Sequence, residues 1–151
     1  MILIDANLLV YAVNRDAFHH NASRTWLEET LGGTVHVGLP WVCILAFLRV
    51  TTHPSIFAAP LRPDQALGHV ESWLAQPFVE AVAPGKRHWP VLRNLLRVTG
   101  SAGNLTTDAH IAALAIEHGA TIFSADHDFK RFPGVHHVNP LEPVGRGEPV
   151  H

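Results

Sequence analysis

Three aspartates of this 151-residue chain stand where carboxylates can do chemistry. Asp5 follows the apolar run 1–4, Asp126 follows a second apolar segment, and Asp108 stands at the start of a helical pattern. Brought together they would repel, because two carboxylates about 4 Å apart interact unfavourably by roughly 4 kcal/mol at an effective dielectric constant near 20. A divalent cation offsets this repulsion at neutral pH, and oxygen-only ligands favour Mg²⁺ or Mn²⁺. Such a cation binds phosphate oxygens and activates water, so the three residues indicate phosphoryl chemistry.

Short apolar segments alternate with helical patterns along the chain. This alternation is typical of right-handed βαβ crossovers, and it predicts an α/β fold with three layers, α/β/α, around a central, mostly parallel sheet. The strands are expected at residues 1–4, 35–37, 79–82, 121–123 and 135–138, and the helices at 18–31, 40–52, 63–74, 89–100 and 108–118.

The carboxyl edge of such a sheet is where ligands bind. Asp5 and Asp126 each follow a predicted strand, so both are expected at that edge. Asp108 lies in the first turn of the helix that leads into the strand before Asp126, where the helix N-terminus favours a carboxylate. Asn104, one helical turn earlier, can hold Asp108 by hydrogen bonding or complete a coordination shell. For Asp5 a second interpretation stays open, in which it only starts a turn or caps the following helix.

Composition limits the class of protein. A chain of this length with 47% hydrophobic residues predicts one domain with one core. No apolar run approaches the roughly 20 residues that a bilayer span requires, so no membrane association is expected. The single cysteine, Cys43, cannot form an internal disulfide and is interpreted as a small core side chain in a reducing compartment. We therefore expect a cytoplasmic protein.

The net charge of −2 argues against a protein that coats nucleic acid through bulk charge. The distribution of charge is uneven, however, because no Asp or Glu occurs between Glu80 and Asp108. This interval carries several cations and can form a local face that binds phosphates. The cations are Lys86, Arg87, Arg93 and Arg97.

Motifs of other enzyme classes are absent from the sequence. The chain has 12 histidines, but neither HExxH nor the Cys/His spacing of a structural zinc site. It also lacks GxSxG, GxGxxG and a P-loop, so serine hydrolases, dinucleotide enzymes and P-loop nucleotide triphosphatases find no support.

Four stretches resemble a known family: ILIDANLLVYA at the start, LAFLRVTTHPSIF, NLTTDAHIAALAIEHGATIFSADHDFKRF, and the closing HVNPL. Together they are similar to a PIN domain, in particular to VapC-type toxins of bacterial toxin-antitoxin pairs. The resemblance spans residues 1–141 and leaves 142–151 as an expected flexible tail. It implies an endoribonuclease that depends on Mg²⁺ or Mn²⁺ and is neutralised by a cognate antitoxin protein.

The resemblance also assigns roles to single positions. Asp5, Asp108 and Asp126 match the catalytic and metal-binding acids of the family, and Asp128 is an additional candidate ligand. Ala46 stands where the family usually has a glutamate, which is a departure that bears on catalysis and on the number of metal ions. The positions that match supporting residues of the family are Asn7, Asn104, Thr106 and Ser124.

RNA is thus the expected substrate, with its scissile phosphate near the three aspartates. Arg49 is expected to contact either a substrate phosphate or the protein partner, and the four cations between Lys86 and Arg97 to contact neighbouring phosphates. A homodimer is also expected. The candidate surfaces for the partner or the second copy are Trp41, Phe57, residues 58–60 and Trp73.

Two other functions remain open from the sequence. A phosphatase of the haloacid-dehalogenase type also places an aspartate after its first strand, but it normally needs a second aspartate where this chain has Asn7. A non-catalytic PIN-like module that binds RNA or protein is suggested by Ala46. Trapping a phosphoryl group on Asp5 would favour the first alternative, and RNA binding without cleavage would favour the second.

Overall fold

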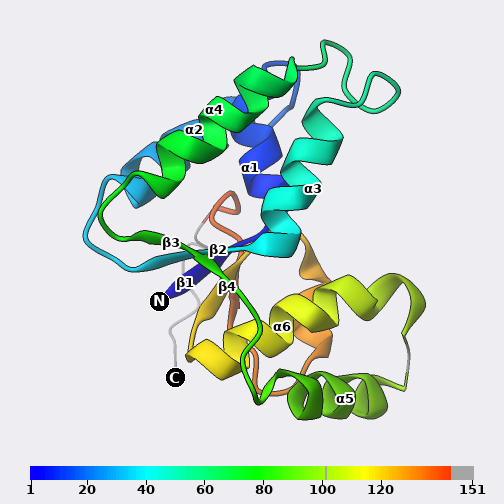
Figure 1. Ribbon diagram of the computed structural model, residues 1–151. Coiled ribbons are helices and arrows are strands. Elements are labelled where there is room, and N and C mark those ends of the chain that lie inside the picture. The colour runs from blue at the N-terminus through cyan, green and yellow to red at the C-terminus, as the bar shows by residue number, and fades with distance from the viewer. Residues whose placement is uncertain (101, 144–151) are drawn as a thin grey trace.

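The sheet at the centre of the protein has five strands, as seen in a computed structural model that describes residues 1–100 and 102–143 (Figure 1). The strand order is β3-β2-β1-β4-β5 and every neighbouring pair is parallel. The first strand in sequence is therefore the central one. The strands are β1 (Ile2–Ile4), β2 (Val37–Pro40), β3 (Val79–Val82), β4 (Thr121–Phe123) and β5 (His137–Val138).

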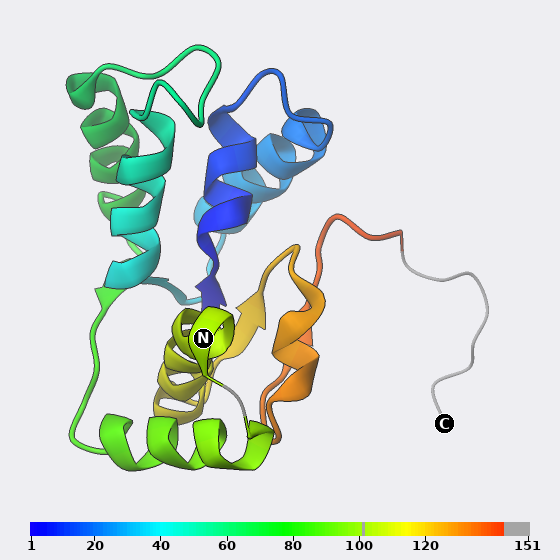
Figure 2. The ribbon, with the colours of Figure 1, turned by 90° about the vertical axis from the view of Figure 1, so that its right-hand side faces the viewer.

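Helices cover both faces of this sheet, as Figures 1 and 2 show. One face carries α1 (Ala6–Val13), α2 (His20–Leu31), α3 (Trp41–Thr51) and α4 (Pro63–Leu74). The opposite face carries α5 (His88–Thr99) and α6 (Thr106–His118), with two short 3-10 helices, η1 (Gly103–Leu105) and η2 (His127–Arg131). The predicted three-layer α/β/α fold is thus confirmed.

Two hydrophobic clusters hold these layers together, one on each side of the sheet. Successive side chains of a strand point to opposite faces. Accordingly Leu3 packs into the cluster with α5 and α6, whereas Ile4 packs into the cluster with α1 to α4, and neither retains any exposed surface. A β1 strand buried on both faces explains why its sequence is an unbroken apolar run.

The second strand differs from the prediction. It was expected at 35–37 but forms at Val37–Pro40, and Pro40 both ends this strand and is the N-cap residue of α3. At its centre a Cβ added to Gly38 would lie 2.6 Å from both Leu3 Cδ2 and Val82 Cγ2. The neighbouring side chains therefore close over a position that only glycine fits, and the low strand propensity of glycine and proline hid the strand.

Helix α1 was missing from the prediction. The segment Ala6–Val13 is apolar on several sides, since it packs against both α2 and α3, and its sequence lacks the polar face that marks an amphipathic helix. Helix α6 also begins at Thr106, two residues earlier than expected, because η1 leads directly into it. The predicted stops are confirmed, since Gly100 and Gly119 end their helices with φ of 65° and 61°.

Of the expected tail at 142–151, residues 144–151 lie outside the described residues. Within residues 1–100 and 102–143, no helix combines the length and apolar content needed to cross a bilayer.

Candidate metal and catalytic site

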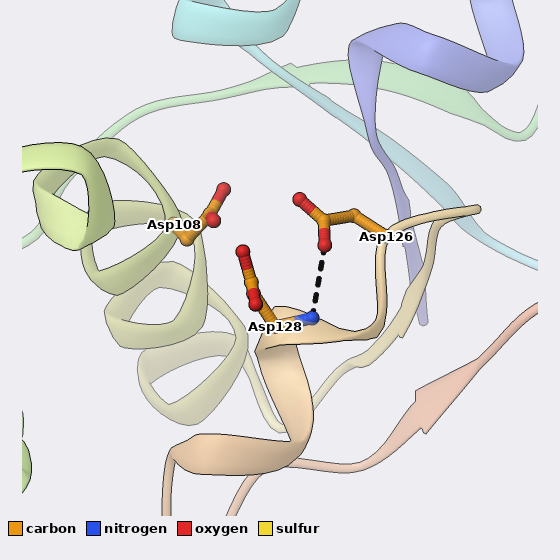
Figure 3. A group of neighbouring side chains, drawn as sticks. All are labelled: Asp108, Asp126 and Asp128. Atoms are coloured by element: carbon orange, nitrogen blue, oxygen red, sulfur yellow. Dashed lines mark hydrogen bonds between the residues drawn. The ribbon is translucent and has the colours of Figure 1, made fainter.

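Three carboxylates converge at the carboxyl edge of the sheet. Asp108 comes from the first turn of α6, while Asp126 and Asp128 come from the segment after β4. One oxygen of each lies within 4.8 Å of an oxygen of the other two, and Figure 3 shows the three side chains facing a common space. Asp126 caps η2 by accepting a 2.9 Å hydrogen bond from the Asp128 amide, which fixes the spacing of these two residues.

The electrostatics of this cluster call for positive charge. Burial, the largest cause, together with the charges of Asp126, Asp5 and Asp128, raises the pKa of Asp108 to about 6. Each effect disfavours an ionised Asp108. Several partly buried carboxylate oxygens with no sulfur or nitrogen ligand form the donor set that Mg²⁺ and Mn²⁺ prefer, so the residues present fit such a cation.

Asp5 lies beside this cluster without being part of the group of three. It follows β1 directly and caps α1, because its Oδ1 accepts a 2.8 Å hydrogen bond from the Ala6 amide. Burial raises the pKa of Asp5, and the charge of Asp126 adds to that rise. The two interpretations of Asp5 are therefore compatible, since it is a helix cap that also lies within electrostatic reach of the acids.

Ser124 connects Asp5 to the other acids. Its hydroxyl is fully buried, donates to Asp5 Oδ2 at 2.7 Å, and accepts from the Asp126 amide at 3.0 Å and from Asn7 Nδ2 at 3.1 Å. Asn7 also donates to Asp5 Oδ2 at 3.4 Å and accepts from the Ala125 amide at 3.3 Å. This network joins the ends of β1 and β4, and it orients two of the acids.

Cys43 is a contact of the site that sequence reasoning missed. It is buried, as expected of a core residue, but its Sγ lies 3.7 Å from Asp5 Oδ1, which is hydrogen-bond range for sulfur. Burial raises the pKa of this thiol well above its usual value, and the nearby charge of Asp5 does so as well. Cys43 precedes Ala46 by one turn of α3, which was the only sequence signal that this residue faces the site.

The other predicted residues lie at varied distances from the acids. Asn104 lines an open pocket together with Asp128 and Arg131. Thr106 is exposed at the first position of α6, and Arg49 is exposed in the last turn of α3. The four cations lie on the loop before α5 and on α5 itself. Ala46 is partly buried within α3.

Two of the residues suggested for a partner surface have little exposed area. Phe57 is 6% exposed and Trp73, a member of the core cluster with α3 and α4, is 8% exposed, but both line a pocket on that side of the fold. Trp41 is 49% exposed, and residues 58–60 are also exposed. Of the residues named from the sequence, these remain available at the surface.

Comparison with known proteins supports one family. Residues 2–135 match the sequence model of the PIN domain. Ribonuclease VapC37 of Mycobacterium tuberculosis is 46% identical over 135 residues, which cover 89% of this chain and 94% of that protein. Ribonuclease VapC33 of the same species is 39% identical over 141 residues, covering 93% and 99%. The chain therefore belongs to the PIN domain family, in the group of VapC ribonucleases.

Solved structures agree with this fold. VapBC2 from Rickettsia felis, in a crystal structure with a DNA fragment from its promoter, superposes with a TM-score of 0.68 at 20% identity and covers 92% of this chain and 98% of that one. VapBC-1 from nontypeable Haemophilus influenzae has a TM-score of 0.65 at 15% identity and covers 94% and 100%.

Proposed function

We propose that this protein is a metal-dependent endoribonuclease toxin whose metal site is formed by Asp5, Asp108, Asp126 and Asp128. The observation that carries the proposal is the convergence of three carboxylates within 4.8 Å, with Asp5 held beside them. When bound, Mg²⁺ or Mn²⁺ supplies positive charge for a phosphate oxygen and lowers the pKa of a bound water. The family assignment supports RNA as the substrate.

The residues around the acids have a separate task, which is to hold the carboxylates in place. Both oxygens of Asp5 accept hydrogen bonds, Oδ1 from the Ala6 amide and the Cys43 thiol, and Oδ2 from Ser124 and Asn7. These donors prevent Asp5 from rotating and partly offset the cost of its burial. An Asp5 side chain fixed in this way contributes negative charge at a constant position.

Cleavage of a mixed RNA pool tests the proposal. We expect the purified protein to cut RNA in Mg²⁺ or Mn²⁺ and to stop in EDTA. Asp5→Asn should abolish cutting, whereas the control Asp64→Asn should not, because Asp64 is exposed at the start of α4. Cutting in EDTA, or full activity of a folded Asp5→Asn protein, would contradict the proposed centre.

A partner antitoxin is the second part of the proposal. One structural neighbour is a toxin-antitoxin complex from Klebsiella pneumoniae. A pocket of about 740 Å³ is formed by α1, α2, α4 and the loop between α3 and α4. Its wall is apolar at Leu27, Phe57 and Trp73 and charged at Arg15 and Glu28. This mixture suits a protein segment with apolar anchors and polar flanks.

The homodimer is proposed on a different surface. Trp41 and Leu45 are one turn apart on α3 and are 49% and 60% exposed. Large exposed apolar side chains grouped in this way are typical of protein contacts. Leu45→Glu should convert a dimer to a monomer in light scattering after size exclusion, and an unchanged dimer mass would remove this surface.

We place the protein in the cytoplasm, where a thiol such as Cys43 stays reduced.

One alternative keeps its own supporting observation. Ala46 provides no carboxylate on α3, so a PIN-like module that binds RNA or protein without cutting is the second candidate function. The same assay distinguishes the two functions. RNA that is bound but never cut, by a wild-type protein that binds Mn²⁺, would favour the binding module.

A further inference from the structure

The outer face of α5 combines an exposed aromatic ring with positive charge. Trp89 is 64% exposed on the first turn of the helix. Arg93 and Arg97 follow at intervals of four residues, so the three side chains form a stripe along one side of the helix. Lys86 and Arg87 extend the positive charge just before the helix begins, and all four cations are exposed.

No carboxylate neutralises this stripe within the described part of the chain. Helix α5 contains no Asp or Glu, and none of the four cations forms an ion pair among residues 1–100 and 102–143. Within the same residues, no other aromatic ring stacks on Trp89. A large flat ring and several cations are thus left facing solvent without partners of their own.

Helix α5 is nevertheless anchored firmly to α6. His88, next to Trp89, is buried between the two helices, with Nδ1 3.0 Å from Glu117 Oε1 and Nε2 2.9 Å from His110 Nδ1. The Gly85 amide donates to the same Glu117 oxygen at 3.2 Å. Because these contacts fix the first turn of α5, its outer face is presented in one orientation.

The stripe also leads toward the acids. Helix α5 ends at Gly100, and the chain continues to η1, whose residues line the open pocket that contains Asp128 and Arg131. Figure 2 shows α5 lying on the outer side of α6, against which it packs. Arg97, the last cation of the stripe, precedes Gly103 of this pocket by six residues in sequence.

We propose that this face of α5 is a platform for single-stranded RNA, on which Trp89 stacks a base while Arg93 and Arg97 bind phosphates. The inference rests on the proposed ribonuclease function and adds the form of its substrate. Base–aromatic stacking requires an unpaired base, so the platform selects single strands over duplexes. A second copy of the chain fits this face poorly, because a symmetric contact would bring arginines together.

Binding can be measured apart from cleavage by working in EDTA. The probe is a short fluorescein-labelled oligouridine, compared with a duplex RNA of equal length, by fluorescence anisotropy across a salt series. The test variants are Trp89→Ala, Trp89→Phe and the double variant Arg93→Ala with Arg97→Ala. Matched controls are Phe18→Ala, which removes an exposed aromatic ring, and Arg62→Ala, which removes an exposed cation from the opposite layer.

The two kinds of variant have different expected signatures. Trp89→Ala should weaken binding of the single strand by roughly tenfold without changing its salt dependence, and Trp89→Phe should recover most of the loss. The double arginine variant should lower the slope of log affinity against log salt by about 1.4, since each single-strand phosphate contact contributes about 0.7. The control variants should keep the wild-type affinity for the single strand. Binding of the duplex should not change when Trp89 is replaced.

Three results would overturn the platform: wild-type affinity in both α5 variants, equal losses in the controls, or no single-strand binding by the wild type. If the α5 variants lose affinity for poly-glutamate but keep their affinity for RNA, the face would be assigned to an acidic protein segment instead. Cleavage measured in parallel separates the two proposals. If the α5 variants bind and cut RNA as the wild type does, only the platform is refuted. If the wild type never cuts RNA but its RNA binding is lost in the α5 variants, only the nuclease function is refuted.

Discussion

The hydroxyl of Ser124 donates a 2.7 Å hydrogen bond to Asp5 although the two residues are 119 positions apart in sequence. The contact exists because β1 and β4 are parallel neighbours, so both residues follow directly after paired strands. Ser124→Ala would leave Asp5 Oδ2 and the Asp126 amide short of a partner. We expect a loss of about 1–3 kcal/mol in the free energy of unfolding, together with reduced RNA cleavage.

Urea denaturation and the RNA cleavage rate check this expectation, with Ser72→Ala as the control. Ser72 is exposed and donates only to a carbonyl of its own helix, so its loss should change neither quantity. Equal stability of the Ser124→Ala protein and the wild type would show that the buried hydroxyl does not support the site.

The raised pKa of Asp108 predicts a stability that depends on pH in the metal-free protein. Its folded pKa of about 6 exceeds the ordinary value of 3.8, so the folded state holds this proton more tightly than the unfolded state does. The stabilising contribution is complete below about pH 4 and is lost as the pH rises through about 6. In EDTA, Asp108→Asn should therefore melt higher than the wild type near pH 7.5.

The advantage of Asp108→Asn should shrink as the pH falls toward about 4, and thermal melts across this range measure it. With Mg²⁺ or Mn²⁺ at neutral pH, the wild type should instead melt higher than Asp108→Asn, because only the wild type gains the full stabilisation from metal binding. An Asp108→Asn protein that melts below the wild type in EDTA at every pH would contradict this account of the cluster.

The buried pair of His88 and Glu117 predicts a different stability change. His88→Ala removes the group that faces Glu117 Oε1 and leaves this buried carboxylate with the Gly85 amide as its remaining partner. A cost of about 1–3 kcal/mol follows for the buried group that loses its hydrogen bond. Arg24→Ala, which breaks an exposed pair with Glu28, should cost less than about 1 kcal/mol in the same urea titrations. Equal costs would refute the argument from burial.

Gly38 offers a prediction about packing. Gly38→Ala places a methyl group 2.6 Å from side-chain carbons of Leu3 and Val82, so overpacking should cost about 1–3 kcal/mol of unfolding free energy. Gly68 is the matched control, since nothing lies within 4 Å of an added Cβ and α4 favours alanine. Chemical denaturation should show that Gly38→Ala lowers the free energy of unfolding and that Gly68→Ala raises it. Destabilisation of Gly68→Ala without destabilisation of Gly38→Ala would contradict the packing argument.

The predictable part of this structure is the part that local pattern determines. The apolar runs and glycine stops located β1, β4 and the core of α6. The carboxyl-edge rule then placed Asp5 and Asp126 at one edge of the sheet, and the first turn of the helix before β4 placed Asp108 near them. Long-range packing determined the rest. Helix α1 lacks an amphipathic pattern because it is enclosed by neighbours, and the contact between Cys43 and Asp5 joins elements 38 positions apart.

The acids themselves provide the most direct test, because the central claim is that they hold a divalent cation. Titration calorimetry with Mn²⁺ should show binding to the wild type and to Asp64→Asn, and little or none to Asp126→Asn, in which the amide oxygen can still accept the hydrogen bond that caps η2. Equal Mn²⁺ affinity in all three proteins would contradict the claim.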